Sequence, residues 1–161
     1  MPDVIWCSPD CSTYSKLGIQ FHRIKQGYTP IPISEYAKYC DENNRQMFNF
    51  ITSLNVLWFF ENPTALMRYM DFTERLPRYT TTYCQYGESI RKETDIFTNH
   101  PNPDFKKPCK NGDSCHLPVG RFGKYGNGIQ NGIKSSFDRA KLPKMFCEHI
   151  FKICDEYYKG D

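Results

Sequence analysis

The sequence VLWFFENP at residues 56–63 decides the predicted fold. Its first five residues form an uninterrupted apolar run, which is followed by Glu61, Asn62 and Pro63. Such a run is typical of a strand buried on both faces of a parallel sheet. A second run, VIWC at residues 4–7, stands before a Ser-Pro dipeptide and predicts another buried strand.

The segment between these two strands predicts a helix. Residues 34–53 carry apolar side chains at roughly helical spacing, and Ser34 is an imperfect N-cap. Strand, loop, helix, strand is one crossover unit of a parallel sheet, so the sequence predicts an α/β fold. Residues 16–32 contain glycine, proline and several basic residues, and they predict a mobile surface loop.

The rest of the chain predicts a less regular arrangement. We expect a short helix at 64–70, then strands at 80–85 and 95–99 that pair as a hairpin. Residues 100–135 predict an extended loop region that needs an internal staple or a partner to order it. Residues 142–158 predict a closing helix with Pro143 in its first turn. The predicted organisation is therefore a core at 1–99, a loop-rich region at 100–135 and a C-terminal helix at 136–161.

Composition limits the functional classes. The chain has 161 residues, the size of one ordinary domain, and a net charge of +3 that permits contact with a polyanion without the basic excess of a dedicated nucleic-acid binder. It has no apolar stretch of about 18 residues and no signal-peptide pattern, which predicts a cytoplasmic protein without membrane contact. The eight cysteines do not frame short loops, so we expect them to be reduced.

Two reactive residue types follow the two buried strands. Cys11 lies in the sequence SPDCSTYS at residues 8–15, and Glu61 ends the aromatic strand. Parallel-sheet proteins place functional groups in the crevice at the carboxyl ends of their strands, so we expect a thiol and an acid to meet there. Taken singly, Cys11 also fits a plain turn cysteine, and Glu61 an exposed acid that caps the following helix.

Together these residues resemble the cytosine-5 DNA methyltransferase family. Its signature order is a Pro-Cys loop ending in serine, a Glu-Asn dipeptide after a strand, and a Tyr-Gly segment with spaced basic residues. Here SPDCSTYS, the Glu61-Asn62 pair and YGESIRKET at residues 86–94 occur in that order. The third segment is closest to phage-type members. The resemblance covers roughly residues 3–99, and the closing helix only weakly.

The resemblance implies a fold, a reaction and a set of roles. The fold is the C-terminal part of a Rossmann-like class I methyltransferase, strands four to seven with flanking helices, in the cytoplasm of a bacterial or phage-infected host cell. The reaction adds the Cys11 thiolate to carbon 6 of a flipped cytosine, Glu61 acts at ring nitrogen 3, and carbon 5 takes a methyl group from S-adenosylmethionine. The family pattern assigns Ser8 and Pro9 to the cofactor side, and to the substrate side Ser15, Asn62 and Pro63.

Three positions depart from the family pattern. Two family arginines that contact the flipped base correspond to Lys92 and Thr94, and Asp10 replaces the usual proline before the nucleophile. A lysine cannot reproduce an arginine fork, and a nearby carboxylate disfavours a thiolate. The alternative is therefore a catalytically inactive DNA-binding or regulatory module. A third hypothesis is a different reaction that also begins with thiolate addition to a pyrimidine.

The donor-binding half of the family normally precedes the Pro-Cys loop. Here three residues precede the first predicted strand, and no Gly-rich turn joins an early strand to a helix. We therefore expect another chain to complete the S-adenosylmethionine site. That chain, a separate subunit or a second copy, would cover the edge of the first strand. The alternative is that the sequence is a piece of a longer polypeptide.

The loop-rich region holds two further candidate sites. Cys109, Cys115 and His116 form a Cys-x5-Cys-His cluster, in which a zinc ion would act as a staple. Its fourth ligand would be Cys84, His100 or another distant residue; otherwise the cysteines are ordinary loop thiols. In the Gly-rich segment 120–134, Arg121 and Lys124 are candidates for contact with a DNA strand. The alternative for that segment is a plain flexible linker.

Overall fold

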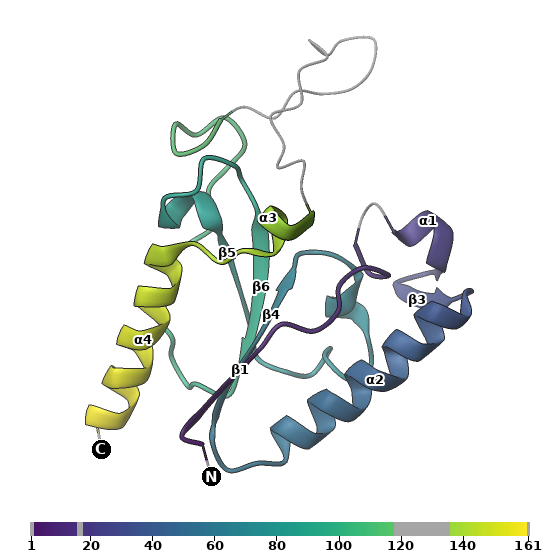
Figure 1. Cartoon of the computed structure of the whole chain (residues 1–161), viewed down its shortest axis with the longest axis horizontal. Helices are drawn as coiled ribbons and strands as arrows, with labels where there is room; N and C mark the ends of the chain where they lie inside the picture. Colours follow the sequence, from purple (N-terminus) through teal and green to yellow (C-terminus); the bar gives the residue numbers. More distant parts are fainter. Residues whose placement is uncertain (1, 16–17, 118–135, 161) are drawn as a thin grey trace. The chain divides into compact units, whose positions relative to one another are not determined.

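The computed structural model describes residues 2–15, 18–117 and 136–160 (Figure 1). The chain divides into two compact units. Unit 1 comprises Met1–Tyr79 and Thr94–Asn102, and unit 2 comprises Thr80–Glu93 and Pro103–Asp161. Each unit is therefore built from two separate stretches of the sequence.

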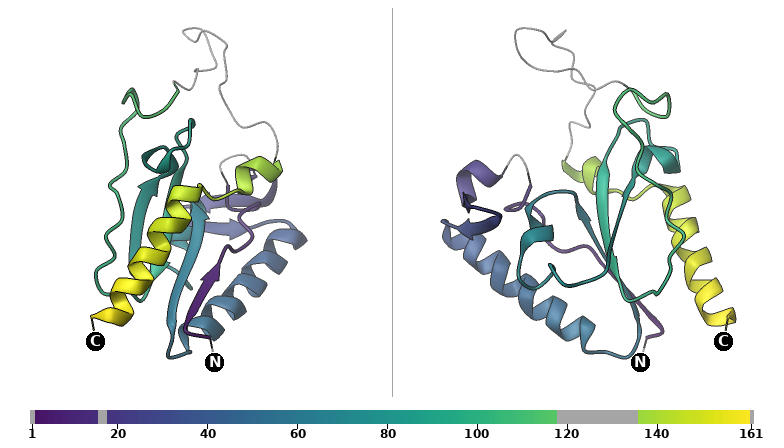
Figure 2. Two further views of the ribbon diagram at one scale, coloured as in Figure 1. Left: turned by 60° about the vertical axis from the view of Figure 1, so that its left-hand side comes forward. Right: turned by 180° about the vertical axis from the view of Figure 1, so that it is seen from behind.

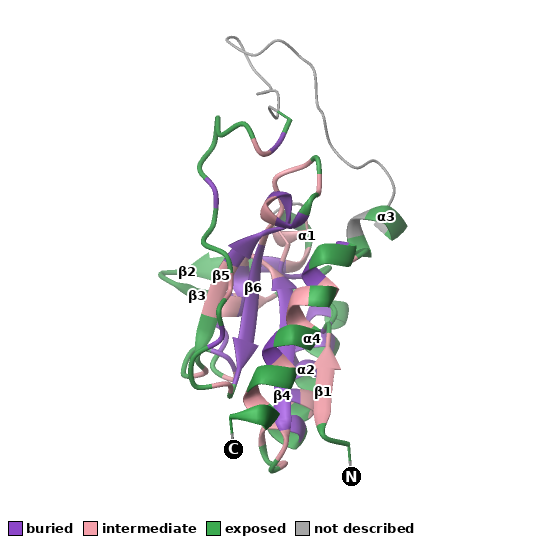
Figure 3. Cartoon of the chain, turned by 90° about the vertical axis from the view of Figure 1, so that its left-hand side faces the viewer, coloured by how far each residue is buried: buried purple, intermediate pink, exposed green. Residues whose placement is uncertain are grey.

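A mixed four-stranded sheet has the order β1-β4-β6-β5. β1 (Val4–Cys7) pairs in parallel with β4 (Leu57–Pro63), which pairs antiparallel with β6 (Glu93–Thr98). The two apolar runs are thus confirmed as strands that pair in parallel in an α/β fold, but the predicted burial of the run at 4–7 is wrong. β1 is an edge strand and is half-buried, whereas β4 and β6 are buried along nearly their whole length (Figure 3).

The helix between the parallel strands is also confirmed. α2 (Glu35–Thr52) follows Ser34, whose side chain accepts a hydrogen bond from the amide of Ala37 at 3.1 Å, so this residue is a genuine N-cap. The ring of Phe48 on α2 stacks on Phe60 of β4 with centroids 3.9 Å apart, and α2 runs along one face of β1 and β4 (Figure 2). Burial of a phenylalanine side chain contributes about 2 kcal/mol, so this contact helps to fix the face that α2 covers.

The prediction of a mobile loop at residues 16–32 is wrong for the residues that the structure describes. They form α1 (Ile19–His22) and an antiparallel hairpin of β2 (Arg23–Gln26) and β3 (Thr29–Pro32). Gly27, at φ 64°, supplies the left-handed residue of the two-residue connection. The hairpin is anchored by the buried side chain of Arg23, a tertiary interaction that local sequence patterns do not reveal.

Two further predictions need correction. The predicted strand at 80–85 ends early, because β5 spans Arg78–Thr82 and the 3-10 helix η2 (Tyr83–Tyr86) follows, with Gly87 at φ 90° as its left-handed C-cap. The predicted hairpin partners are confirmed as neighbours in the sheet. The predicted helix at 64–70 is only the single-turn 3-10 helix η1 (Leu66–Tyr69).

Unit 2 packs around aromatic side chains. α4 (Lys144–Lys159) confirms the predicted closing helix, although Pro143 is its N-cap rather than part of its first turn. Phe146 of α4 packs against Tyr83 and Tyr86 of η2, at centroid distances of 5.2 and 5.0 Å. The short helix α3 (Ser136–Ala140) precedes α4, and residues 103–117 have no regular secondary structure, as predicted. Among the described residues, no helix is long and apolar enough to cross a membrane.

Candidate active site at the strand ends

The structure brings the Cys11 loop, the Glu61-Asn62-Pro63 segment and Thr94, the last residue of the third motif, to the same edge of the sheet, where β1 and β4 end. β1 and β4 are parallel, with Cys7 opposite Phe60, so the segments after them leave the sheet at the same edge. The side-chain amide of Asn62 donates a hydrogen bond to the Pro9 carbonyl at 3.2 Å and joins the two segments directly. β6 is antiparallel to β4 and starts at this edge, where Thr94 lies opposite Pro63.

The Cys11 loop is held in a defined turn. The Cys11 carbonyl accepts hydrogen bonds from the amides of Tyr14 at 3.1 Å and Ser15 at 3.0 Å, so this cysteine begins a helical turn. Its side chain is half-buried. The hydroxyl of Ser15 donates to the Ser12 carbonyl and accepts from the Gly18 amide, which closes the loop. At the start of the loop, Ser8 accepts a hydrogen bond from the Trp6 indole at 3.3 Å, and Pro9 is buried.

Asp10, which stands at the family's proline position, shapes this loop. Its carboxylate accepts from the Ser12 amide at 2.7 Å, the geometry of an Asx turn, and from the Tyr36 hydroxyl at 2.6 Å. Burial acts to raise the pKa of Asp10, but the hydrogen bonds from Tyr36 and Ser12 outweigh it and hold the pKa below its usual value. The carboxylate is thus engaged by the loop and by α2.

Beneath the loop lies a buried polar network that sequence analysis missed. The Arg23 guanidinium donates to both carboxylate oxygens of Asp41, at 3.0 and 2.6 Å, and to the Thr13 carbonyl at 2.9 Å. The Tyr14 hydroxyl donates to Asp41 at 2.5 Å, and burial together with that carboxylate raises the pKa of Tyr14. Asn44 donates to the Asp10 carbonyl at 3.2 Å, so the network supports the backbone of the loop that carries Cys11.

Glu61 and Thr94 lie on one face of the sheet. Because side chains alternate along a strand, Glu61 points away from the face of Phe60 that α2 covers. Glu61 lies opposite Ile96 and Pro63 opposite Thr94, so Glu61 and Thr94 are diagonal neighbours on that face. Glu61 is only 6% exposed, and the alternative of an exposed capping acid is therefore wrong.

Two buried polar atoms at this edge have no hydrogen-bond partner within the described part of the chain. They are Oδ1 of Asn62 and Oγ1 of Thr94, on neighbouring strands. Buried polar atoms are nearly always satisfied, and leaving one unpaired costs about 1–3 kcal/mol. Because side chains alternate along β4, Asn62 points to the face that α2 covers, whereas Thr94 lies on the opposite face with Glu61, so only the Thr94 hydroxyl lies on the face of Glu61.

A second ion pair that the sequence did not predict ties η1 to β6. The Arg68 guanidinium makes a two-pronged contact with Asp95, with Nε to Oδ2 at 2.9 Å and Nη2 to Oδ1 at 2.5 Å. Asp95 lies opposite Asn62 in the sheet. The segment after the Glu-Asn pair is therefore fixed to the neighbouring strand.

The remaining predicted residues lie elsewhere. Lys92 belongs to unit 2, where its carbonyl accepts from the Tyr83 amide at 3.0 Å and its ammonium lies 4.7 Å from the centre of the Tyr83 ring. Arg121 and Lys124 lie outside the described residues.

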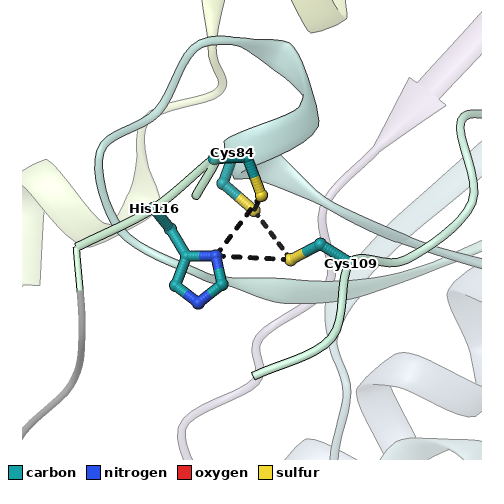
Figure 4. Close-up of side chains that lie close together, drawn as sticks. Cys84, Cys109 and His116 are labelled. Carbon is teal, nitrogen blue, oxygen red and sulfur yellow. Dashed lines mark hydrogen bonds between the residues drawn. The ribbon is translucent and has the colours of Figure 1, made fainter. Parts of the chain in front are cut away.

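Unit 2 also contains the predicted cysteine-histidine cluster. Cys109, Cys115 and His116 come together, and the additional member is Cys84 rather than His100. Figure 4 labels three of the four, Cys84, Cys109 and His116. Burial raises the pKa of Cys84 to about 12. Burial also acts to raise the pKa of Cys109, but hydrogen bonds from Thr82 and Cys84 outweigh it and lower that pKa.

Comparison with known proteins gives no family assignment. No protein-family model and no curated protein matches the sequence. The arrangement of the side chains must therefore carry the functional argument.

Proposed function

We propose that the chain is the target-base half of a cytosine-5 DNA methyltransferase, with Cys11 as nucleophile and S-adenosylmethionine held by another polypeptide. The observation that carries the proposal is the meeting of the Cys11 loop, the Glu61-Asn62-Pro63 segment and Thr94 at one sheet edge. These segments are far apart in the sequence. Their convergence is what a shared site requires, and the parallel pairing of β1 with β4 provides it.

The proposed chemistry is an addition followed by an elimination. The Cys11 thiolate forms a bond to carbon 6 of a flipped cytosine, and the ring electrons move toward carbon 5 and nitrogen 3. Glu61 stabilises the charge at nitrogen 3 as a hydrogen-bond donor and general acid. Carbon 5 then takes the methyl group from the donor sulfonium, which leaves as a neutral thioether. Water, acting as base, removes the carbon 5 proton, the Cys11 thiolate departs from carbon 6 and the proton at nitrogen 3 returns to Glu61, which restores the ring.

Thr94 and Lys92 replace the arginines that contact the base in the family. The unpartnered hydroxyl of Thr94, on the same sheet face as Glu61, supports a role in hydrogen bonding to the target nucleotide. One hydroxyl offers a single contact where a guanidinium offers a fork, so base contact in this chain is weaker or is shared with other groups. Lys92 supplies a positive charge for the backbone phosphates.

The donor side of the site is proposed to face Ser8 and Pro9. β1 is an edge strand, and an edge strand accepts a further strand through its free backbone groups. We propose that the donor-binding polypeptide, a separate subunit or a second copy, docks along β1. The proposed partners of the chain are then this polypeptide and DNA. Asn62, Pro63 and Ser15 are the proposed DNA contacts of unit 1, and Arg121 and Lys124, which lie outside the described residues, are proposed DNA contacts on the sequence alone. In keeping with the resemblance, we propose that the reaction takes place in the cytoplasm.

A covalent trapping experiment tests the proposal without the donor. In 5-azacytosine, ring position 5 is a nitrogen, so thiolate addition at carbon 6 needs no methyl transfer. The chain is incubated with a random-sequence pool of duplexes containing this base, and the adduct is located by peptide mass spectrometry. We expect an adduct on Cys11, absent from Cys11→Ser and retained in Cys147→Ser, a half-buried control thiol on α4. No adduct on Cys11 at saturating protein contradicts the proposal.

A second candidate function is an inactive DNA-binding or regulatory module. Two observations favour it: Thr94 carries no charge, and the Asp10 carboxylate stands directly before Cys11. On this alternative, the duplex pool is bound without an adduct, and Cys11→Ala leaves the dissociation constant unchanged. The third hypothesis, a different reaction at the pyrimidine, predicts an adduct on Cys11 together with a product mass other than that of methylcytosine.

A further inference from the structure

We propose that Cys84, Cys109, Cys115 and His116 bind one Zn²⁺ ion as a closed structural site. This inference does not depend on the proposed function, because all four residues belong to unit 2 and the argument uses only their own geometry. Figure 4 shows the imidazole of His116 turned toward the thiols.

The distances between the four ligand atoms fit a tetrahedral ion. The atoms all lie within 4.8 Å of one another. A tetrahedral zinc ion with Zn–S of about 2.3 Å and Zn–N of about 2.0 Å holds its ligand atoms roughly 3.5–3.8 Å apart. The Sγ atoms of Cys115 and Cys84 are 3.7 Å apart, and Nδ1 of His116 lies 3.6 Å from Cys109 and 3.4 Å from Cys115.

One pair lies closer than the metal requires. The Sγ atoms of Cys84 and Cys109 are 3.1 Å apart, well beyond the roughly 2.05 Å of a disulfide bond. Both cysteines are free. A zinc ion between them needs a rotation of one side chain, because three of the other five distances already match and all lie within 4.8 Å. A disulfide is the competing state, so the experiment must report on it.

The donor set and its burial distinguish a structural site from a catalytic one. Three thiols and one imidazole are a soft donor set that zinc prefers, and four protein ligands leave no open position for water or substrate. Cys84, Cys109 and His116 are buried, and Cys115 is half-buried. Without a metal ion, three thiols and an imidazole can form mainly weak hydrogen bonds that involve sulfur. A metal ion instead forms a bond to each of the four side chains.

Neighbouring groups hold the ligands in place. The amide of Cys109 donates to the Thr82 hydroxyl at 3.0 Å, and the side-chain amide of Gln85 donates to Sγ of Cys115 at 3.6 Å. Nδ1 of His116 faces the sulfurs and is therefore the ligating nitrogen. Nε2 then carries the proton, and it is buried without a hydrogen-bond partner among the described residues. The contacts from Thr82 and Gln85 are of the kind that orients metal ligands, whereas the described residues offer no acceptor to Nε2 of His116.

The site would staple the irregular part of unit 2. Cys84 lies in η2, whereas the other three ligands lie in residues 103–117, which have no regular secondary structure. The Arg91 side chain donates to the Cys109 carbonyl at 3.3 Å, and the Leu117 amide donates to the Ser89 carbonyl at 2.8 Å. Since a metal that closes a long loop contributes its binding free energy to folding, zinc would order residues 80–93 together with 103–117.

Metal content tests the site directly. The chain is produced with zinc under reducing conditions, and zinc per chain is measured by mass spectrometry of the ion. We expect about one Zn²⁺ per chain, falling to less than about a tenth in Cys109→Ser and Cys115→Ser. Cys147→Ser and Cys154→Ser, which change half-buried thiols on α4, should keep the full amount. Cys115→His, which preserves a ligand, should retain most of the zinc.

A second measurement covers variants that fail to fold. A chelator is added to the unmodified chain, and hydrogen exchange is followed by peptide. We expect protection to be lost in residues 80–93 and 103–117 while α2 in unit 1 keeps its protection. Any one of three results overturns the proposal. The first is a chain that contains no zinc and whose hydrogen exchange does not change when the chelator is added. The others are a zinc content that the cysteine substitutions leave unchanged, and a Cys84–Cys109 disulfide in the reduced preparation. None of these results bears on trapping at Cys11, so the two proposals fail separately.

Discussion

At the scale of single residues, Asp10 shows how one substitution changes the chemistry of a loop. A proline at this position would fix the backbone by its ring, whereas Asp10 fixes it by an Asx turn to Ser12 and a hydrogen bond from Tyr36. The same hydrogen bonds keep a negative charge beside Cys11. Loop shape and nucleophile electrostatics are therefore coupled through one carboxylate.

The substitution Tyr36→Phe tests this coupling through pH. Asp10 has a lowered pKa in the folded chain, so its contribution to stability is present above the unfolded pKa of about 3.9 and is lost as pH falls through the folded value. Without the Tyr36 hydroxyl, we expect the pKa of Asp10 to rise toward its usual value, so its contribution to stability shrinks and less stability is lost as the pH falls below about 3.9. Carbon-detected NMR titration of the Asp10 carboxyl measures both the starting value and the change.

A matched control is Tyr39→Phe, on the exposed surface of the same helix. It should leave the Asp10 titration unchanged. Equal titration curves for Tyr36→Phe and the unmodified chain would show that the hydrogen bond does not lower this pKa.

At the scale of elements, the sequence predicted those parts whose signals are local. The strands β1 and β4 and the helices α2 and α4 were found because apolar runs and helical spacing report burial directly. The hairpin of β2 and β3 was missed because its order depends on Arg23, whose partner Asp41 lies eighteen residues away on α2. Basic residues in a Gly- and Pro-containing stretch look like a solvated loop until the partner is known.

The residues of the two candidate sites also differ in whether a local sequence signal marks them. Cys11 and Glu61 were predicted because each follows a recognisable strand. Cys84 was only one candidate for the fourth metal ligand, beside His100 or another distant residue, because it lies 25 residues before Cys109 and no spacing rule connects them. The unpartnered hydroxyl of Thr94 and the Arg68–Asp95 pair depend on sheet register and side-chain placement, which the sequence does not specify.

The Arg23–Asp41 pair provides a prediction at the element scale. Asp41→Asn leaves the buried guanidinium without its counter-charge, and breaking a buried pair in this way costs about 3–5 kcal/mol. We expect the free energy of unfolding, from urea denaturation of unit 1 probes at an unchanged m-value, to fall by about that amount. Glu42→Gln, one residue along on the exposed surface of α2, should change it by less than about 0.5 kcal/mol. Similar losses in both variants would assign the effect to the helix rather than to the pair.

At the scale of the whole molecule, the residues of the two proposed sites are divided between the two units. Unit 1 carries Cys11, Glu61 and Thr94, and unit 2 carries Lys92 and the cysteine-histidine cluster. A substitution that destabilises unit 2 can leave the reactivity of Cys11 unchanged. A substitution that abolishes addition of the Cys11 thiol can leave the fold intact. The most useful variants are therefore those for which stability and function are expected to move in opposite directions.

Thr94→Val is such a variant. The side chains have nearly the same shape, so the change removes a buried hydroxyl that has no partner among the described residues. Relieving an unpaired buried polar atom should raise the free energy of unfolding by about 1 kcal/mol. If the hydroxyl binds the target nucleotide, the same change should slow Cys11 adduct formation with the 5-azacytosine pool about tenfold, since 1.4 kcal/mol of lost interaction is a factor of ten.

Thr73→Val is the matched control, because its buried hydroxyl donates to the Met70 carbonyl at 3.1 Å. This variant should be less stable by about 1 kcal/mol, and the chains that remain folded should form the adduct at an unchanged rate. A stabilised Thr94→Val chain that forms the adduct at the original rate would mean that the open hydroxyl has no part in binding the base.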